Sequence, residues 1–118
     1  MAALDGRNYE VERLVTVAET DTLRVRLYTL AAGQEVPWHY HSHVTDTFFC
    51  LEGTLSVETR SAERHCVLGA GESCAVPPMT AHRVTGHGGS RVRFLIVQGV
   101  GTYDFRPVGR NSTARQDP

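Results

Sequence analysis

The most informative stretch of this chain runs from residue 33 to residue 53 and reads GQEVPWHYHSHVTDTFFCLEG. Side chains two positions apart on a β-strand point to the same face, so His39 and His41 would present two imidazoles close enough to bind one ion. Asp46 follows five residues after His41, which lets the chain bend and return a carboxylate on the neighbouring strand. The stretch therefore predicts a metal site built on paired strands.

A fourth candidate ligand lies further along the chain. His82 follows a turn, Pro77 to Thr80, and falls on another expected strand, from which it could complete the set of ligands. Imidazoles combined with a carboxylate and open positions suit Fe(II), Mn(II), Ni(II), Cu(II) or Zn(II). We expect one divalent transition metal per chain, with iron favoured, held by His39, His41, Asp46 and His82.

The rest of the chain predicts an all-β fold. Short runs rich in Val, Leu, Thr, Phe and Tyr are closed by Gly, Pro or small polar clusters, at a spacing typical of a sandwich or a closed barrel. No stretch has a convincing helical period. The expected strands are Tyr9–Val17, Leu23–Leu30, Val36–His41, Thr47–Leu51, Leu55–Thr59, Arg64–Val67, Ser73–Val76, Ala81–Val84 and Val92–Val97.

Two stretches of the chain resemble the two motifs of the cupin family. The first motif, G-x5-H-x-H-x3–4-E-x6-G, is matched by Gly33, His39, His41, Asp46 (at the Glu position) and Gly53; the second, G-x5-P-x-G-x2-H-x3-N, by Gly71, Pro77 and His82. The resemblance implies a small double-stranded β-helix, or jelly-roll, barrel with one metal inside it. We expect a single barrel domain over residues 1–100, with its motifs at 33–53 and 71–86, and a polar, frayed tail over residues 101–118.

The sequence departs from the family pattern at three positions. Asp46 is one methylene shorter than Glu, so it either reaches the metal or accepts a hydrogen bond from a ligand histidine. Met79 stands at the second glycine of the second motif and Gly86 at its asparagine.

His43 lies two residues after His41, so His41 and His43 form an alternative pair of ligands. The sequence spacings back to Gly33 and forward to Asp46 favour the pair of His39 and His41.

Several side chains are candidates for the wall of a substrate pocket. If Asp46 points inward, the alternation of a strand also turns Phe48 and Cys50 inward, and it places Phe94 and Gln98 on one face of the last strand. Met79 lies near the turn before His82, where it either narrows the pocket or simply packs. The expected pocket residues are therefore Tyr28, Phe48, Cys50, Met79, Phe94 and Gln98.

Arg24 and Arg26 share one face of their expected strand with Tyr28. An inward orientation would suit an anionic substrate such as a carboxylate, because guanidinium groups pair with carboxylates through two parallel hydrogen bonds. An outward orientation would make them a solvated stripe or a dimer contact.

The composition limits the partners and the compartment of the protein. A net charge of −1 over 118 residues gives no reason to expect binding to nucleic acid or to an anionic membrane. All twelve basic residues are arginine, which excludes lysine Schiff-base chemistry. No apolar run is long enough to span a bilayer. Three cysteines without CxxC spacing fit reduced thiols, so we expect a cytoplasmic protein.

Two expected strands, 47–51 and 92–97, are apolar on both faces. A strand in a monomeric barrel would show one face to water, so the outer face needs a cover. A homodimer would supply one, and the N-terminal strand of the chain itself is the alternative.

The site leaves three functional classes open. The first hypothesis is a small metal-dependent oxygenase that acts on a small organic substrate inside the barrel. The same ion could instead act as a Lewis acid in a non-redox isomerase or lyase. The third possibility is a module that binds or senses a small molecule without turnover.

Overall fold

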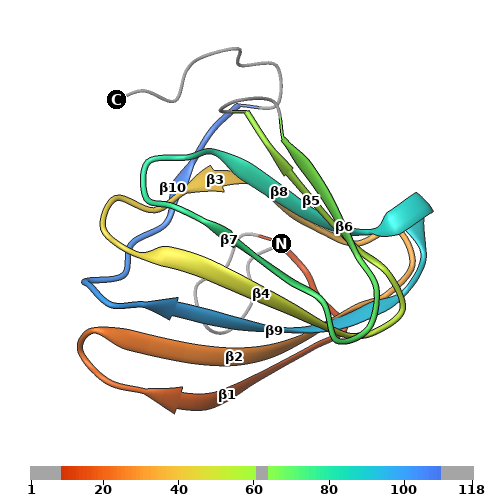
Figure 1. Ribbon diagram of the computed structural model, residues 1–118, viewed down its shortest axis with the longest axis horizontal. Coiled ribbons are helices and arrows are strands. Elements are labelled where there is room, and N and C mark those ends of the chain that lie inside the picture. The colour runs from red at the N-terminus through yellow and green to blue at the C-terminus, as the bar shows by residue number, and fades with distance from the viewer. Residues whose placement is uncertain (1–8, 61–63, 110–118) are drawn as a thin grey trace.

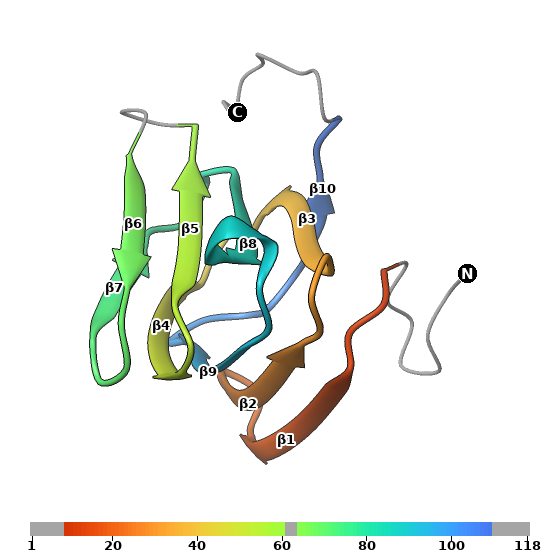
Figure 2. The same ribbon diagram turned by 90° about the vertical axis from the view of Figure 1, so that its right-hand side faces the viewer.

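The described part of the chain, residues 9–60 and 64–109, forms two antiparallel five-stranded sheets in a computed structural model (Figure 1). One sheet has the strand order β1–β2–β9–β4–β7 and the other the order β10–β3–β8–β5–β6. The two sheets face each other as the layers of one rolled-up structure, as the turned view in Figure 2 makes clear. The expected all-β double-stranded β-helix is confirmed.

All nine expected strands are present, and their ends differ from the expected ones by four residues at most. A short 3-10 turn, η2, spans His87–Gly89, and no helix in the described ranges is long and apolar enough to cross a membrane. The strands are β1 Arg13–Glu19, β2 Leu23–Leu30, β3 Glu35–Tyr40, β4 Thr45–Glu52, β5 Leu55–Thr59, β6 His65–Leu68, β7 Ser73–Val76, β8 His82–Gly86, β9 Val92–Gly99 and β10 Arg106–Pro107.

The hydrophobic core lies between the inner faces of the two sheets. Along β9, buried and half-buried side chains alternate strictly from Val92 to Gly99, as expected for a strand with one face on the core. Phe48 and Phe94 are fully buried, and burying a side chain of this size contributes roughly 1.5–3 kcal/mol. Packing between the sheets therefore holds the barrel together and fixes which side chains point inward.

Gly53 explains why the first motif ends in glycine. Its φ of +83° lies in the left-handed region, and a Cβ atom there would come within 2.7 Å of the carbonyl oxygen of Arg91. At the second motif the chain departs from the pattern, because Met79 holds a φ of 63° where the family motif has glycine. The amide of Met79 donates a hydrogen bond of 2.8 Å to the carbonyl oxygen of His41, which ties this turn to the end of β3.

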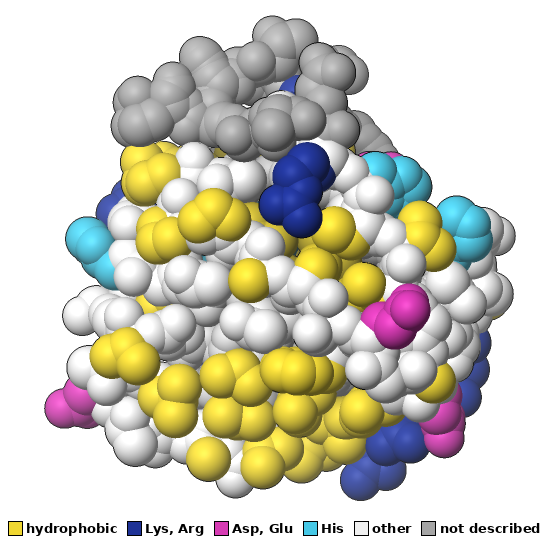
Figure 3. All heavy atoms as spheres, in the orientation of Figure 1, with side chains coloured by type: hydrophobic (Ala, Val, Ile, Leu, Met, Phe, Trp, Pro, Cys, Tyr) yellow, Lys and Arg dark blue, Asp and Glu magenta, His cyan; other side chains and the backbone are white. Residues whose placement is uncertain are grey.

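The outer face of the first sheet is apolar over β1, β2, β4 and β9. Phe49 is 36% exposed and Leu51 42%, and Val17 on β1 is exposed as well. Figure 3 shows hydrophobic side chains gathered in a band over β1, β2 and β9. The strand β1 pairs edge to edge with β2 and does not cover this face, so the chain's own N-terminal strand is not the cover.

Residues 101–109 do not form the frayed tail that the loss of apolar pattern predicts. The amide of Gly101 donates a hydrogen bond to the carbonyl oxygen of Thr22, and β10 pairs with β3. Strand pairing in an existing sheet needs no hydrophobic period of its own, so the sequence pattern carries little sign of it. We call residues 101–109 the C-terminal arm; residues 110–118 of the expected tail lie outside the described residues.

Candidate metal centre

The sheets bring the four expected ligand residues to one point. His39 on β3 pairs directly with His82 at the start of β8, while His41 follows β3 and Asp46 lies on β4 of the opposite sheet. One potential ligand atom from each residue lies within 4.8 Å of all the others. All four residues are at least 97% buried, so this is an interior cluster of chemically active side chains.

Each histidine ring is anchored through its Nδ1 atom to a backbone carbonyl. The Nδ1–H of His39 donates to the carbonyl oxygen of Pro37 at 2.7 Å, and that of His82 donates to Thr80 at 2.8 Å. The Nδ1–H of His41 donates to the carbonyl oxygen of Asp104. A hydrogen bond of this kind fixes the ring orientation of metal-binding histidines and leaves the Nε2 lone pair for the ion.

Asp46 lies at the centre of the hydrogen-bond network. Its Oδ2 atom is 2.9 Å from Nε2 of His41 and 2.9 Å from Nε2 of His82, and its Oδ1 accepts a hydrogen bond of 3.1 Å from Gln98. Burial would raise the pKa of this carboxyl, but the hydrogen bonds and charges of the two histidines outweigh it and hold the pKa well below its usual range. Asp46 is therefore a carboxylate at neutral pH.

The histidines differ in their protonation. Burial, together with the charges of His82 and His41, holds the pKa of His39 well below its usual value, so this ring is neutral. Burial also opposes protonation of His41, but hydrogen bonds to Asp46 and to the Asp104 carbonyl outweigh it and raise its pKa. The carboxylate thus favours a positive charge at the position of the His41 Nε2 atom.

This arrangement fits a bound cation better than it fits protons. In His41 and in His82, the Nδ1–H donates to a backbone carbonyl, so a neutral ring has no second N–H with which to reach Asp46. Both rings could also donate to Asp46 only as two buried imidazolium ions. Two such charges beside one carboxylate are costly to bury. A divalent ion held by His39, His41, His82 and Asp46 would take the place of both protons, and the three Nδ1–carbonyl hydrogen bonds would remain. The donor set, three imidazoles and one carboxylate, is also one that divalent transition metals favour.

Aromatic side chains of the C-terminal arm cover the centre. The ring of Phe105 stacks on His39 at a centroid distance of 4.3 Å, and the ring of Tyr103 lies 5.0 Å from that of His41. Together with Asp104, whose carbonyl accepts the bond from His41, three consecutive arm residues contact the cluster. Burial raises the pKa of the Tyr103 hydroxyl to about 12, so it is a neutral phenol at ordinary pH.

Comparison with known proteins places this architecture in a family. Residues 26–98 match the family model described as the cupin domain (Cupin_2). The chain belongs to the cupin family. No curated protein matches this cupin chain closely.

Solved structures of other cupin-like proteins have the same fold. An uncharacterised protein from Klebsiella pneumoniae with a double-stranded β-helix domain is 23% identical, with a TM-score of 0.69, over 84% of this chain and 87% of that one. The polyketide cyclase RemF from Streptomyces resistomycificus is 19% identical, with a TM-score of 0.69, over 85% of this chain and 72% of its own.

A third similar structure is an oxalate oxidase in complex with the substrate analogue glycolate. It is 19% identical, with a TM-score of 0.63, and the match covers 74% of this chain but only 46% of the oxidase. At these identities the three structures support the cupin fold of this chain and nothing finer.

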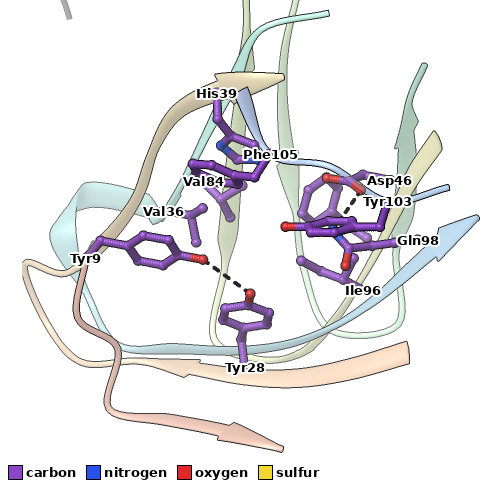
Figure 4. A pocket seen from close by; sticks show the side chains of 11 residues that line it. Tyr9, Tyr28, Val36, His39, Asp46, Val84, Ile96, Gln98, Tyr103 and Phe105 are labelled. Atoms are coloured by element: carbon purple, nitrogen blue, oxygen red, sulfur yellow. Dashed lines mark hydrogen bonds between the residues drawn. The ribbon is translucent and has the colours of Figure 1, made fainter. Parts of the chain in front are cut away.

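A narrow cavity adjoins the candidate metal centre inside the barrel. Three of the six expected pocket residues, Tyr28, Phe48 and Gln98, line it beside His39 and Asp46. Figure 4 shows Tyr9 and Tyr28 joined by a hydrogen bond between their hydroxyls, with Tyr103 across the cavity next to Asp46 and Gln98.

The other three expected pocket residues lie elsewhere. Cys50 and Phe94 point inward as their parity predicts, but they are fully buried in the core deeper in the barrel and do not border the cavity. Met79 is half-buried in the turn before β8 and does not border it either. His43, the alternative ligand, is exposed, and so are His65 and His87.

Four residues at the site are not expected from the sequence: Tyr9, Tyr103, Asp104 and Phe105. The aromatic pair in the segment Gly101–Arg106, GTYDFR, is the one available signal, since aromatic residues are uncommon in a solvated tail. Asp104 acts through its backbone carbonyl, which carries no sequence signal.

Proposed function

We propose that this cupin is a small metal-dependent oxygenase that acts on a small organic substrate held inside the barrel. His39, His41, His82 and Asp46 would hold one divalent transition metal, with iron favoured. The observation that carries the proposal is the anchoring of all three imidazoles through Nδ1, with one potential ligand atom from each ring and from the buried carboxylate lying within 4.8 Å of the others.

A bound iron would supply redox chemistry with O₂ and a substrate. The side chains of the protein would contribute orientation and the exclusion of water. Gln98 holds Asp46 by its Oδ1 atom, which leaves Oδ2 directed at the histidines. Phe48 is fully buried beside His82, and Phe105 stacks on His39, so two faces of the centre are apolar. A dry lining of this kind protects reactive intermediates from side reactions.

A non-redox reaction, such as a cyclisation or isomerisation, is the second candidate. Two observations favour it: the likeness in fold to the polyketide cyclase extends over most of both chains, and the cavity is lined by Tyr9, Tyr28, Phe48, Tyr103 and Phe105. Aromatic walls suit a planar, unsaturated substrate. Binding of a small molecule without turnover is the third candidate.

The metal content of the protein, purified without a histidine tag, separates these candidates. We expect one iron per chain by elemental analysis, with O₂ uptake when small organic acids are added. Zinc or nickel without O₂ uptake would favour the cyclase or isomerase. Metal without conversion of any substrate would favour the binding module.

The ligand assignment has a matched control. Replacing His82 by Ala removes one ligand and is expected to abolish metal retention, whereas His43→Ala, at an exposed position, is expected to leave it unchanged. If the His82→Ala protein keeps its metal, the proposed centre is wrong.

A further inference from the structure

The inner face of the first sheet carries two arginines beside the metal centre. In β2, Arg24 lies directly opposite Gln98 of β9, and Gln98 lies directly opposite Asp46 of β4. Residues directly opposite each other in an antiparallel pair project to the same face. Arg24, Gln98 and Asp46 therefore form one row across three strands, on the face that points into the barrel.

Arg26 belongs to the next row on the same face. It lies opposite Ile96, which in turn lies opposite Phe48, and both of these side chains are buried in the interior. Tyr28, two residues further along β2, is buried and stacks on Phe94. The sequence left open whether this arginine pair points inward or outward, and the strand register resolves it: both arginines point inward.

The arginines have buried polar atoms without partners. The Nε atoms of Arg24 and Arg26 are both shielded from solvent and have no hydrogen-bond acceptor in the described part of the chain. The Arg24 side chain is only 14% exposed; its nearest carboxylate oxygen, on Glu19, is 3.8 Å from Nε, and Glu19 is half exposed. For Arg26, no ion pair is present among residues 9–60 and 64–109.

Tyr103 connects the arginine pair to the metal centre. The guanidinium carbon of Arg24 lies 3.8 Å above the centre of the Tyr103 ring, and the same ring contacts His41. Tyr103 also lines the cavity beside Asp46 and Gln98. Arg24, the Tyr103 ring and the histidine cluster are therefore in contact one after another, and Arg26 lies two residues from Arg24 on the same face of β2.

Among residues 9–60 and 64–109, the exposed Glu19 is the one carboxylate at ion-pair distance from either of the two half-buried arginines. A guanidinium group shielded from water gains stability from an anion or from several acceptors. Asp46 is already shared among His41, His82 and Gln98, so it cannot also serve the arginines. A divalent metal at the centre would increase the excess of positive charge.

We propose that Arg24 and Arg26 form an anion-binding pair that holds the carboxylate of a small organic substrate beside the metal centre. The identification of the bound anion as a substrate rests on the proposed function, whereas the anion site itself does not. Guanidinium groups bind carboxylates through two parallel hydrogen bonds, and the aromatic walls suit the organic part of such a molecule. A carboxylate on an organic molecule is favoured over phosphate because the Tyr103 ring, which lies against Arg24, also lines the cavity beside Asp46.

Acetate and its neutral analogue acetamide are the probes that test the pair. Binding of each to the zinc-loaded protein and to protein stripped with EDTA is measured by calorimetry. We expect acetate to bind both forms at least about tenfold more tightly than acetamide, since one charge-assisted pair of hydrogen bonds is worth about that factor. Equal binding of acetate and acetamide to the stripped wild-type protein would overturn the proposal without any variant.

Variants locate the site. Arg24→Gln and Arg26→Gln are each expected to weaken acetate binding about tenfold or more while zinc content stays at one per chain. Arg93→Gln is the matched control, because Arg93 faces outward on β9 and pairs with Glu52. Arg26→Lys keeps the charge without the planar fork and is expected to recover part of the affinity. Variants that bind acetate like the wild type would overturn the proposal.

The outcomes separate this proposal from that of the metal centre. If acetate binding disappears with the zinc and ignores the arginines, the anion site is wrong and the metal centre stands. If the protein holds no metal but acetate binding depends on the arginines, the anion site stands and the proposed function fails. Inorganic phosphate that binds as tightly as acetate through the same arginines would overturn the carboxylate assignment.

Discussion

The two faces of the sheet β1–β2–β9–β4–β7 differ in a way that follows from single-residue alternation. On β4, Asp46, Phe48 and Cys50 point inward and are fully buried, whereas Phe49 and Leu51 point outward and are exposed. Both faces are rich in apolar residues, but only the inner face carries buried charge. Apolar composition therefore identifies the sheet, whereas buried polar side chains identify the site.

The inner face itself changes along the strands. The row that contains Arg24, Gln98 and Asp46 is polar, while the row of Tyr28, Phe94 and Cys50, four residues further along β2, is almost wholly apolar. One end of the barrel thus holds the chemistry and the other supplies the packing that keeps it rigid. A site on rigid strands holds its side chains more accurately than one on loops.

The same substitution on the two faces gives the largest contrast. Phe94→Ala removes a fully buried ring and is expected to lower the free energy of unfolding by about 3–5 kcal/mol. Phe49→Ala, one strand away and 36% exposed in the single chain, is expected to cost the monomer less than about 1 kcal/mol, because little packing within the chain is lost. Urea denaturation of both variants measures the difference, and equal losses would mean that the outer face is as well packed as the core.

Neighbouring residues on β4 sharpen the contrast in chemistry. Asp46→Asn keeps the shape of the side chain but removes the buried carboxylate. It is expected to weaken metal binding at least about 100-fold, because even the loss of a hydrogen-bond partner of a metal ligand can cost about that factor. Thr47→Val, on the outer face of the same strand, is expected to leave metal affinity unchanged. Competition with a chelator of known affinity measures both. An Asp46→Asn protein with wild-type affinity would exclude the carboxylate as a ligand.

Sequence reasoning succeeds where the side chains of the site follow regular strands. His39, Asp46 and His82 could be assigned because a period of two and the motif spacing fix both their face and their place along the strand. The inward orientation of Arg24 and Arg26 could not, because a strand has two faces and the choice depends on pairing with β9. The C-terminal arm was missed for another reason.

The contacts of the arm carry almost no pattern. β10 is two residues long, and its pairing with β3 uses backbone groups that every residue has. Asp104 supports His41 by its carbonyl oxygen, so its side chain gives no indication of that role. Tyr103 and Phe105 lie two residues apart, but no longer alternation surrounds them from which a strand could be inferred.

The exposed apolar side chains of the outer face allow a test of the homodimer that the sequence predicts. A second copy covering Phe49 and Leu51 would make the wild-type protein about twice its monomer mass of 13.0 kDa in sedimentation. The double variant Phe49→Ser, Leu51→Ser is then expected to sediment as a monomer, since serine removes the apolar contact.

Val67→Ser is the control for this experiment. Val67 is 44% exposed on β6, in the other sheet, so its replacement is expected to leave the dimer intact. A wild-type protein that is monomeric at all concentrations would contradict the prediction and leave the apolar face without a cover.

The smallest expected effect concerns Tyr103, which the arm places over the polar row of the inner face. Burial raises the pKa of its hydroxyl from the ordinary value of 10.0 to about 12, so the folded state disfavours the phenolate. Because the pKa is higher in the folded than in the unfolded state, the folded protein binds this proton more tightly and loses stability as the pH rises from about 10 through about 12.

The variant Tyr103→Phe has no such proton and is expected to lose less stability over this pH range. Absorbance titration of the phenolate in both proteins measures the pKa directly. The hydroxyl of Tyr103 is identified by the absorbance change that the wild type shows and Tyr103→Phe lacks. If that hydroxyl titrates near pH 10, Tyr103 is not buried by the arm, and its contact with His41 is wrong.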